Sequence, residues 1–291
     1  MRFEIVKNKK DVPIEQVMAL LKESYWANNR PQEVVEISLA HSDVYYAINS
    51  DTGEAVGMGR VLTDYATNYY LSDFIVEETC RGTGIGTTLI HRIVNDESVA
   101  KLRGIILTEN KHASLEWEGF IPNTDRCMVR EAGTTAKPPM DTDIENFEVV
   151  RFSKGIHFED VMTLMKESYW GNQRSEETVH NSIANSECFC AVAKDTGMLI
   201  GMARVITDHA AYYYLCDVIV DEEYRRHGVG RNVINAIVTD PELGPLRGIL
   251  LTRDAHGFYE KFGFVREPRK CMERPRADQK AAEAAQLLHR K

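Results

Sequence analysis

Apolar residues in the second half of the chain follow two spacings in turn, one typical of helices and one typical of strands. Segments with apolar residues three or four positions apart are separated by short stretches rich in β-branched and aromatic residues. The expected helices are 161–169, 175–186, 228–239 and 257–262, and the expected strands are 189–193, 199–207, 213–220 and 247–251. Short turns connect the strands 189–193, 199–207 and 213–220 to one another. We therefore expect these three strands to be antiparallel. The pattern predicts a mixed α/β (α+β) fold.

The same pattern occurs twice, at a constant offset of 144 residues. Residues 17–26, VMALLKESYW, recur at 161–170 as VMTLMKESYW, and eight of these ten positions are identical. A repeat this long indicates tandem domains, because solenoid repeats have about 20 to 50 residues. The predicted organisation is a first domain at 1–132, a linker at 133–146, a second domain at 147–274 and a helix-prone basic tail at 275–291.

Composition narrows the classes of protein and partner. The 291 residues are 43% hydrophobic and 27% charged, which allows two domains with a core each. No stretch approaches the roughly 18 consecutive apolar residues of a membrane span, and the first residues do not resemble a secretory signal. We therefore expect a cytoplasmic protein without a membrane partner, and the net charge of -9 argues against nucleic acid. The six cysteines form no C-x-x-C pair, so we expect reduced thiols rather than disulfides or metal ligands.

A glycine-containing loop joins the expected strand 213–220 to the helix that follows it, with the pattern Arg225-x-x-Gly228-x-Gly230. The first backbone N–H groups of a helix are unpaired, and the helix dipole favours an anion such as a pyrophosphate. The spacing fits neither G-x-G-x-x-G nor G-x-x-x-x-G-K-[ST]. A plain helix-capping turn remains the alternative interpretation of the loop on its own. The loop residues are Arg225, Arg226, His227, Gly228, Val229 and Gly230 in the second copy, and Arg81, Gly82, Thr83, Gly84, Ile85 and Gly86 in the first.

The loop and a second motif, Phe258-Tyr259-Glu260-Lys261-Phe262-Gly263-Phe264, together resemble the GCN5-related N-acetyltransferase (GNAT) family. The single helix and strand between the two motifs are also similar to that family. The resemblance implies two tandem domains, each with a mixed, mostly antiparallel central sheet flanked by helices. It also implies acetyl-CoA as the cofactor, with the pyrophosphate on the loop and with Val218, Val220 and Thr252 beside the acetyl and pantetheine groups.

Tyr259 resembles the catalytic acid of that family, which protonates the departing thiolate. A tyrosine in an apolar helix is, on its own, more often a packed residue with a satisfied hydroxyl. The cofactor loop at the right distance favours catalysis instead. In the first copy the offset places Leu115 at the position of Tyr259. We therefore expect an active second domain and a catalytically degenerate first domain.

Three residues are candidates for the base that takes a proton from the attacking amine: Asp217, His256 and Asp208. Asp217 leads, and its alternative role is to anchor the substrate ammonium. His256 could instead cap its helix, and Asp208 is most typical of a turn. The oxyanion donor is expected to be a backbone N–H near Val218. The residues expected to bind substrate are Trp170, Arg174, Arg204 and Asp208.

Three functions follow from these motifs. The first is N-acetyl transfer from acetyl-CoA to an amine of a small molecule by direct attack, with Tyr259 as the acid. The second is a coenzyme A-binding sensor without turnover, and the third is a scaffold whose first half is an interaction surface. An intact Tyr259 favours the first. The sequence leaves the acceptor amine and the oligomeric state open, and a homo-oligomer is compatible with it.

Overall fold

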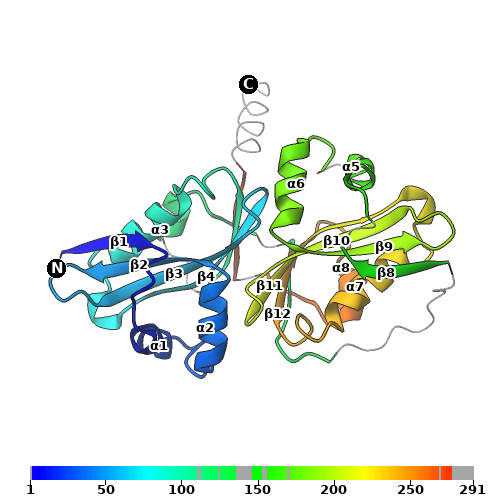
Figure 1. Ribbon diagram of the computed structural model, residues 1–291. Coiled ribbons are helices and arrows are strands. Elements are labelled where there is room, and N and C mark those ends of the chain that lie inside the picture. The colour runs from blue at the N-terminus through cyan, green and yellow to red at the C-terminus, as the bar shows by residue number, and fades with distance from the viewer. Residues whose placement is uncertain are drawn as a thin grey trace. The chain divides into compact units, whose positions relative to one another are not determined.

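The structure is a computed structural model that describes residues 2–109, 113–123, 125–135, 146–152, 156–168, 171–268 and 270–276. The chain forms two compact units. Unit 1 consists of residues 1–124 and 268–291, and unit 2 consists of residues 125–267. Each unit contains one seven-stranded sheet with helices against both of its faces (Figure 1).

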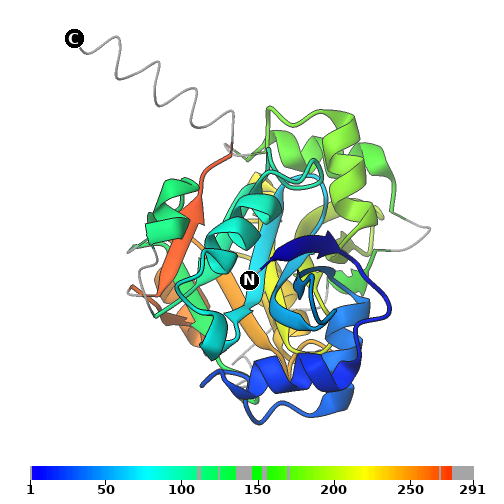
Figure 2. The same ribbon diagram turned by 90° about the vertical axis from the view of Figure 1, so that its left-hand side faces the viewer.

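Unit 1 has the strand order β1-β2-β3-β4-β5-β14-β6, and all neighbouring strands are antiparallel except the parallel pair β4 and β5. Helices α1 and α2 pack on one face of this sheet and α3 on the other (Figure 2). Its elements are β1 (Phe3–Lys7), α1 (Ile14–Lys22), α2 (Gln32–Ala40), β2 (Asp43–Asn49), β3 (Ala55–Thr63), β4 (Asn68–Val76), η1 (Glu78–Cys80), α3 (Ile85–Val94), β5 (Arg103–Leu107), α4 (Ala113–Trp117), β6 (Ile121–Pro122) and β14 (Cys271–Arg274).

Unit 2 repeats this arrangement with the order β13-β7-β12-β11-β10-β9-β8, in which only β11 and β12 are parallel. Helices α5 and α6 cover one face and α7 covers the other. Its elements are β7 (Cys127–Arg130), β8 (Phe147–Arg151), α5 (Phe158–Lys166), α6 (Glu176–Ala184), β9 (Glu187–Ala193), β10 (Leu199–Thr207), β11 (Tyr212–Val220), η2 (Glu222–Tyr224), α7 (Val229–Val238), β12 (Arg247–Leu251), α8 (His256–Tyr259), η3 (Glu260–Phe262) and β13 (Val265–Arg266).

The structure confirms the α/β class and most of the expected elements. The strands predicted at 199–207 and 247–251 have these bounds in the structure, and the three expected antiparallel strands are antiparallel. The helix expected at 161–169 begins earlier, at Phe158, and ends at Lys166. It ends there because the Ser168 hydroxyl and N–H both donate to the carbonyl of Met165, which closes the last turn.

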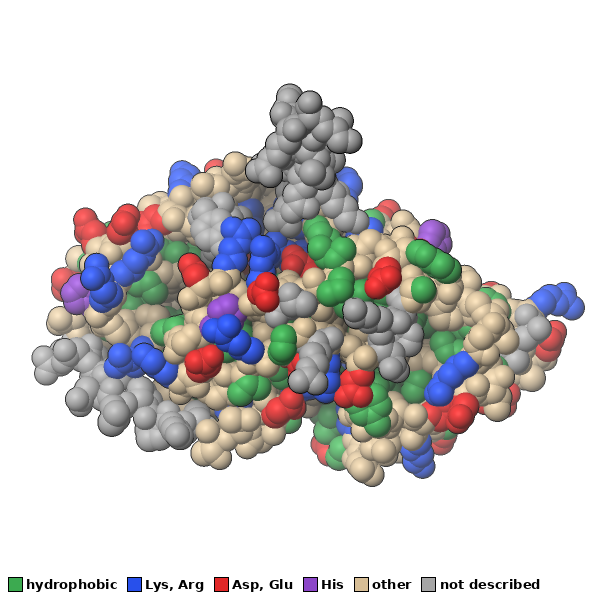
Figure 3. Space-filling view, turned by 180° about the vertical axis from the view of Figure 1, so that it is seen from behind, with side chains coloured by type: hydrophobic (Ala, Val, Ile, Leu, Met, Phe, Trp, Pro, Cys, Tyr) green, Lys and Arg blue, Asp and Glu red, His purple; other side chains and the backbone are tan. Residues whose placement is uncertain are grey.

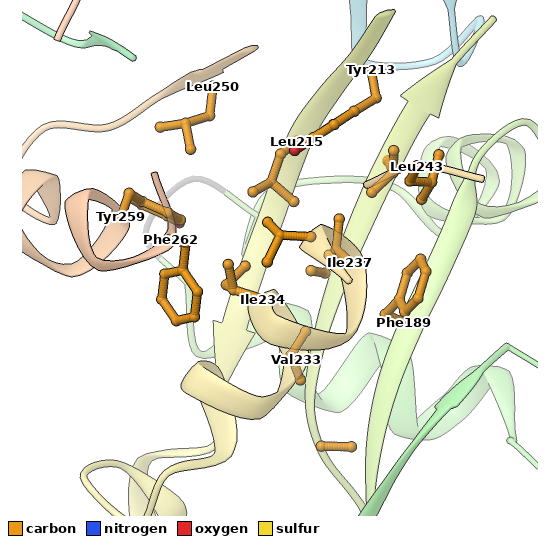
Figure 4. Close-up of a cluster of buried hydrophobic side chains, with 14 of the residues drawn as sticks. Phe189, Tyr213, Leu215, Val233, Ile234, Ile237, Leu243, Leu250, Tyr259 and Phe262 are labelled. Atoms are coloured by element: carbon orange, nitrogen blue, oxygen red, sulfur yellow. The ribbon is translucent and has the colours of Figure 1, made fainter. Parts of the chain in front are cut away.

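The α7 side of unit 2 holds the larger of its two cores. Val233, Ile234 and Ile237 of α7 are fully buried against Leu215 of β11 and Leu250 of β12 (Figure 4). Each such side chain stabilises the fold by about 1.5 to 3 kcal/mol relative to its exposed state. Because α7 is fixed by this core, the loop at its N-terminus is held at a defined place beside the sheet.

The last strand of each sequence repeat belongs to the sheet of the other repeat. Cys127–Arg130, from the first repeat, lies between β12 and β13 of unit 2, and Cys271–Arg274, from the second, lies between β5 and β6 of unit 1. The compact units therefore differ from the expected domains 1–132 and 147–274. The two strands are related by the offset of the repeat, so each occupies in one sheet the position that its counterpart occupies in the other.

One arginine in each exchanged strand, buried Arg130 and half-buried Arg274, holds the strand in place. Arg130 is fully buried and donates hydrogen bonds to the carbonyls of Phe262, Gly244 and Thr134, all within unit 2. Arg274 donates to carbonyls of unit 1 in the same way, with both distances at 3.0 Å. Each guanidinium thus satisfies carbonyl groups that would otherwise need other donors.

All six cysteines are free, and Cys216 is half-buried while the others are buried. Within the described ranges, we find no helix with the length and apolarity needed to cross a membrane. Acidic and basic side chains are interspersed on the face of the molecule drawn in Figure 3. Most of the predicted linker (136–145) and most of the predicted tail (277–291) lie outside the described residues.

We predict that residues 146–276 produced alone do not unfold cooperatively, because their sheet lacks the strand Cys127–Arg130 between β12 and β13. Mixing them with residues 2–135 restores cooperative unfolding, since each fragment supplies the strand that the other needs. Urea unfolding followed by circular dichroism measures this. The control is the full chain cut once within 133–146, which keeps its transition. An isolated second half with the midpoint of the full chain contradicts the exchange.

Candidate active site

In the part of the chain that the structure describes, strand β11 pairs with two strands in its first half and with one strand in its second half. It pairs with β12 only from Tyr212 to Leu215, whereas its ladder with β10 continues to Val220. Among the described strands, the segment after Leu215 therefore pairs with β10 alone. Backbone N–H and C=O groups on the other edge become available to a ligand.

A β-bulge lies at the point where β11 and β12 separate. Met202 pairs with Ile219 and Arg204 pairs with Cys216, so one residue of β10 is opposite two residues of β11. The first of these two is Asp217, whose φ of 50° lies in the left-handed region. Strand β4 of unit 1 has the same bulge, with a φ of 48° at Asp73.

The expected pyrophosphate loop follows β11 and ends at the N-terminus of α7. Gly228 is the N-cap of α7 with a φ of 83°, and no side chain in the described parts of the chain caps this helix. The first N–H groups of α7 can therefore bind an anion, which fits the coenzyme A pyrophosphate. Arg225 anchors the loop, because its Nε donates to the Val220 carbonyl at 3.2 Å. In unit 1, Arg81 and Gly84 have the same geometry.

A glutamate that the motif analysis missed organises this loop. The Glu167 carboxylate, just after α5, accepts a hydrogen bond from the Glu222 N–H at 3.1 Å and lies 4.0 Å from Arg225 Nη2. In unit 1, Glu23 accepts from the Glu78 N–H and pairs with Arg81. Both glutamates belong to the KESYW segment, which is the most similar part of the repeat.

Gly228 and Gly230 of the loop require glycine for different structural reasons. Gly228 has a φ that strains other residues, and its Cα faces nearly open space. A Cβ on Gly230 would instead meet Val220 Cγ2 at 3.3 Å and Phe258 Cζ at 3.7 Å. Gly230 therefore permits close packing of α7 against β11, while the N-terminal turn beside Gly228 is the part open to a phosphate.

Most of the other residues expected to bind the cofactor also pack in the core or form local hydrogen bonds. Val229 is buried in the core, whereas His227 is exposed. Val218 and Val220 are half-buried against the α7 core cluster. The Thr252 hydroxyl accepts a hydrogen bond from the Ala255 N–H at 3.1 Å and so shapes the start of α8.

Tyr259 lies at the end of α8 with its ring in the α7 core, beside Phe262 and Leu250 (Figure 4). Burial raises the pKa of its hydroxyl, and the negative charge of Asp254 raises this pKa further. Cys216 is the residue directly after the last β11–β12 pair. The Tyr259 ring packs in the same core as Leu215, the last β11 residue that pairs with β12, and burial keeps its hydroxyl protonated at neutral pH.

His256 lies one turn before Tyr259 in α8, so the two side chains share a face of the helix. The ring is buried, and its Nε2 lies 2.7 Å from the Asp125 carbonyl. Because a carbonyl only accepts, Nε2 carries the proton, and Nδ1 of the neutral ring keeps its lone pair.

The environment of Asp217 does not suit a base, which corrects its leading place among the three candidates. Its carboxylate accepts from Arg204 Nε at 2.7 Å and from Arg174 Nη1 and Nη2 at 2.6 and 3.1 Å. Burial would raise the pKa of Asp217, but the two guanidinium groups outweigh it and hold this pKa well below its ordinary range. A carboxylate that binds protons so weakly cannot take one from an amine near neutral pH. Arg174 and Arg204 are occupied by the same contacts.

Asp208 is a turn residue, as its alternative interpretation predicts. Its Oδ1 accepts hydrogen bonds from the N–H groups of Ala210, Ala211 and Tyr212, and the residue is fully buried. Trp170 lies outside the described residues. Of the residues expected to bind substrate, the structure therefore brings together Arg174 and Arg204, and it does so around Asp217.

Unit 1 keeps the framework of this site with one chemical change. Asp73 contacts Arg30 and Arg60 at 2.8 and 2.7 Å, as Asp217 contacts its two arginines. Leu115 of α4 is fully buried in the core at the position of Tyr259. The same fold thus carries an apolar side chain where unit 2 carries a hydroxyl.

The loops of the two units make a matched pair for a stability measurement. Arg226 has a φ of 68°, and Gly82, its counterpart, has a φ of 77° with open space where a Cβ would lie. We expect Arg226→Gly to raise the free energy of unfolding by about 1 kcal/mol by removing left-handed strain, and Gly82→Arg to lower it by a similar amount. Urea unfolding measures both. Shifts of the same sign in the two variants contradict this explanation.

Comparisons with known proteins assign both units to one family. Residues 14–114 match the model of the acetyltransferase (GNAT) family, and residues 185–266 match the model of the acetyltransferase (GNAT) domain. GCN5-related N-acetyltransferase 2, chloroplastic, of Arabidopsis thaliana is 36% identical over 72 residues, which are 24% of this chain and 28% of that protein. The match thus spans little more than a quarter of that relative.

Solved structures share the whole fold at low sequence identity. The GCN5-related N-acetyltransferase from Sphaerobacter thermophilus has a TM-score of 0.54 and 16% identity over 94% of this chain and 96% of its own. A tandem GNAT protein from the clavulanic acid biosynthesis pathway has a TM-score of 0.52 and 15% identity over 94% and 98%. Because the two family matches span more than half of the chain, one in each unit, the protein belongs to the GCN5-related N-acetyltransferase family and contains two tandem GNAT domains.

Proposed function

We propose that unit 2 transfers the acetyl group of acetyl-CoA to the amine of a small molecule. The observation that carries the proposal is the placement of two groups along one edge of β11. Arg225, in the loop before α7, is anchored at the Val220 carbonyl, and the Tyr259 ring packs in the same core as Leu215 of β11 and Leu250 of β12. From Cys216, the first β11 residue without a β12 partner, to Val220 the strand spans at most about 13 Å. An extended pantetheine arm bridges a distance of this order between the pyrophosphate and the thioester.

Acetyl-CoA supplies an activated acetyl group, whose carbonyl carbon bonds to the amine nitrogen while its bond to sulfur breaks. The backbone edge after Leu215 then orients the acyl group, and a backbone N–H at the bulge, near Val218, stabilises negative charge on the carbonyl oxygen. The start of α7 binds the phosphates. Both roles use backbone groups, so they are compatible with different side chains in the two units.

Tyr259 acts on the departing sulfur. Its pKa is raised well above that of a thiol, for which about 8.5 is usual, so complete transfer of its proton to a thiolate is uphill. The hydroxyl therefore stabilises the thiolate mainly by donating a hydrogen bond. This refines the role of a general acid.

His256 is the base that we assign to the amine proton. Asp217 is held by two arginines, and Asp208 is held by three backbone N–H groups, whereas Nδ1 of His256 keeps a lone pair. Histidine is also the side chain that acts most often as a general base in enzymes. The proton leaves the nitrogen as the new C–N bond forms.

A coenzyme A sensor is the alternative function, and release of free thiol distinguishes it. An enzyme releases thiol from acetyl-CoA in the presence of a suitable amine, whereas a sensor binds coenzyme A without release. A panel of small primary amines, with the full chain and with acetyl-CoA, tests the proposal directly. Binding of coenzyme A without turnover of any amine in the panel supports the sensor.

We predict that Tyr259→Phe lowers kcat about a hundredfold, because loss of one donor to a developing charge costs about 2.7 kcal/mol. Packing should be kept, since the ring remains, and coenzyme A affinity should change little. Thiol release and calorimetry measure the two effects. The companion variant Leu115→Tyr, in the Tyr259→Phe chain, tests whether unit 1 can regain turnover. Wild-type kcat in Tyr259→Phe removes this tyrosine from the reaction.

We predict that His256→Gln lowers kcat/KM by about 10² and removes the rise of rate with pH that reports the free base. Glutamine can place an amide N–H where Nε2 donates to the Asp125 carbonyl, so the start of α8 is preserved. His256→Asn, which is too short for this hydrogen bond, serves as the control for loss of structure. If the pH profile of His256→Gln matches that of the wild type, the base is another group.

A further inference from the structure

Three charged side chains form a buried cluster beneath the point where β11 and β12 separate. The cluster consists of Arg174, Asp217 and Arg204, whose side chains are at most 8% exposed. We propose that this cluster is a positioning device for acetyl transfer, which holds the bulge of β11 and thereby directs the backbone N–H of Val218. The inference rests on the proposed function, because it concerns the same site.

The bulge changes which face of the sheet each residue of β11 occupies. Side chains two positions apart share a face in a regular strand. Here Leu215 and Val218, three positions apart, both contact the α7 core, while Ile219 contacts the core under α5 and α6. One extra residue, Asp217, accounts for this shift. Without it, Val218 and its amide would have the opposite orientation.

Holding Asp217 in this place is costly for two reasons. An L-residue other than glycine is strained at a φ of 50°, and a buried carboxylate loses its hydration. Arg174 compensates with two hydrogen bonds, and Arg204 adds one at 2.7 Å. The strained conformation therefore persists because two cations fix the carboxylate from different sides.

Arg204 extends the cluster to the neighbouring helix. Its Nη1 donates to the Ser182 carbonyl in the last turn of α6 at 2.8 Å and to the Ser186 hydroxyl at 2.9 Å. Arg174 immediately precedes Ser175, the N-cap of α6. Both ends of α6 are thereby connected to the bulge, so the cluster aligns this helix, β10 and β11 with one another.

Unit 1 offers a matched control. Arg30, Asp73 and Arg60 form the same cluster, and Arg60 likewise contacts the carbonyl of Ser38 and the hydroxyl of Ser42. Unit 1 has Leu115 at the catalytic position. Loss of the carboxylate should destabilise either unit, but only in unit 2 should it affect turnover.

The test compares Asp217→Asn with Asp73→Asn in the full chain. Asparagine tolerates the left-handed conformation, so the change removes charge more than shape. We expect kcat of Asp217→Asn to fall about a hundredfold, as for a misplaced oxyanion donor, with coenzyme A affinity within about threefold of wild type because α7 is unchanged. Asp73→Asn should keep kcat within about twofold of the wild type. Its thermal unfolding midpoint should fall by about as much as that of Asp217→Asn, since both variants lose the same kind of buried charge.

Two further measurements separate this inference from the proposed function and from loss of folding. Hydrogen exchange in β11 should quicken in Asp217→Asn whether or not the wild type turns over any amine, so slow exchange overturns the inference alone. Arg174→Lys keeps the charge but loses the planar fork that donates to both carboxylate oxygens, and it should give an intermediate kcat. Unchanged kcat in Asp217→Asn, or an equal loss in Asp73→Asn, also overturns the inference.

Discussion

The edge of β11 that faces β12 is the feature on which the rest of unit 2 depends. Up to Leu215 both edges of the strand are paired, and beyond it only the edge toward β10 is. Backbone groups inside a fold are normally satisfied by their neighbours, so a released edge must be supported by other contacts. The bulge at Asp217, the anchor from Arg225 to Val220 and the core under α7 supply that support. The open edge can then pair with a ligand in place of a strand.

Comparison of the two units separates what the fold requires from what the chemistry requires. The buried charge clusters and the loop glutamates Glu23 and Glu167 occur in both units. Removing one partner of a buried ion pair costs about 3 to 5 kcal/mol, so stability is one reason for such groups to be present in both units. The pair Leu115 and Tyr259 differs by one hydroxyl-bearing ring, and both side chains fill a core. The hydroxyl that we propose to act in catalysis can thus be absent without loss of the domain.

Periodicity and glycine spacing predicted the local structure well, because both depend on neighbours in the sequence. The strands 199–207 and 247–251 and the loop before α7 are examples. The partners of Asp217 were not predictable, since Arg174 and Arg204 come from other elements and meet it only in the folded sheet. The role of Glu167 had a signal in the nearly identical KESYW segments. The exchange of strands had no signal in the sequence, because equivalent strands of a repeat carry equivalent patterns.

The exchanged strands also bear on the order of events during synthesis. Leu107 of β5 pairs with Cys271, so the first sheet lacks an internal strand until nearly the whole chain has been made. At about 5 to 20 residues per second, the ribosome needs on the order of ten seconds or more to supply it. During that time β5 presents an open edge, which is a typical site of mispairing. A nascent chain of this kind exposes an unpaired strand edge for longer than one in which each domain is complete as it emerges.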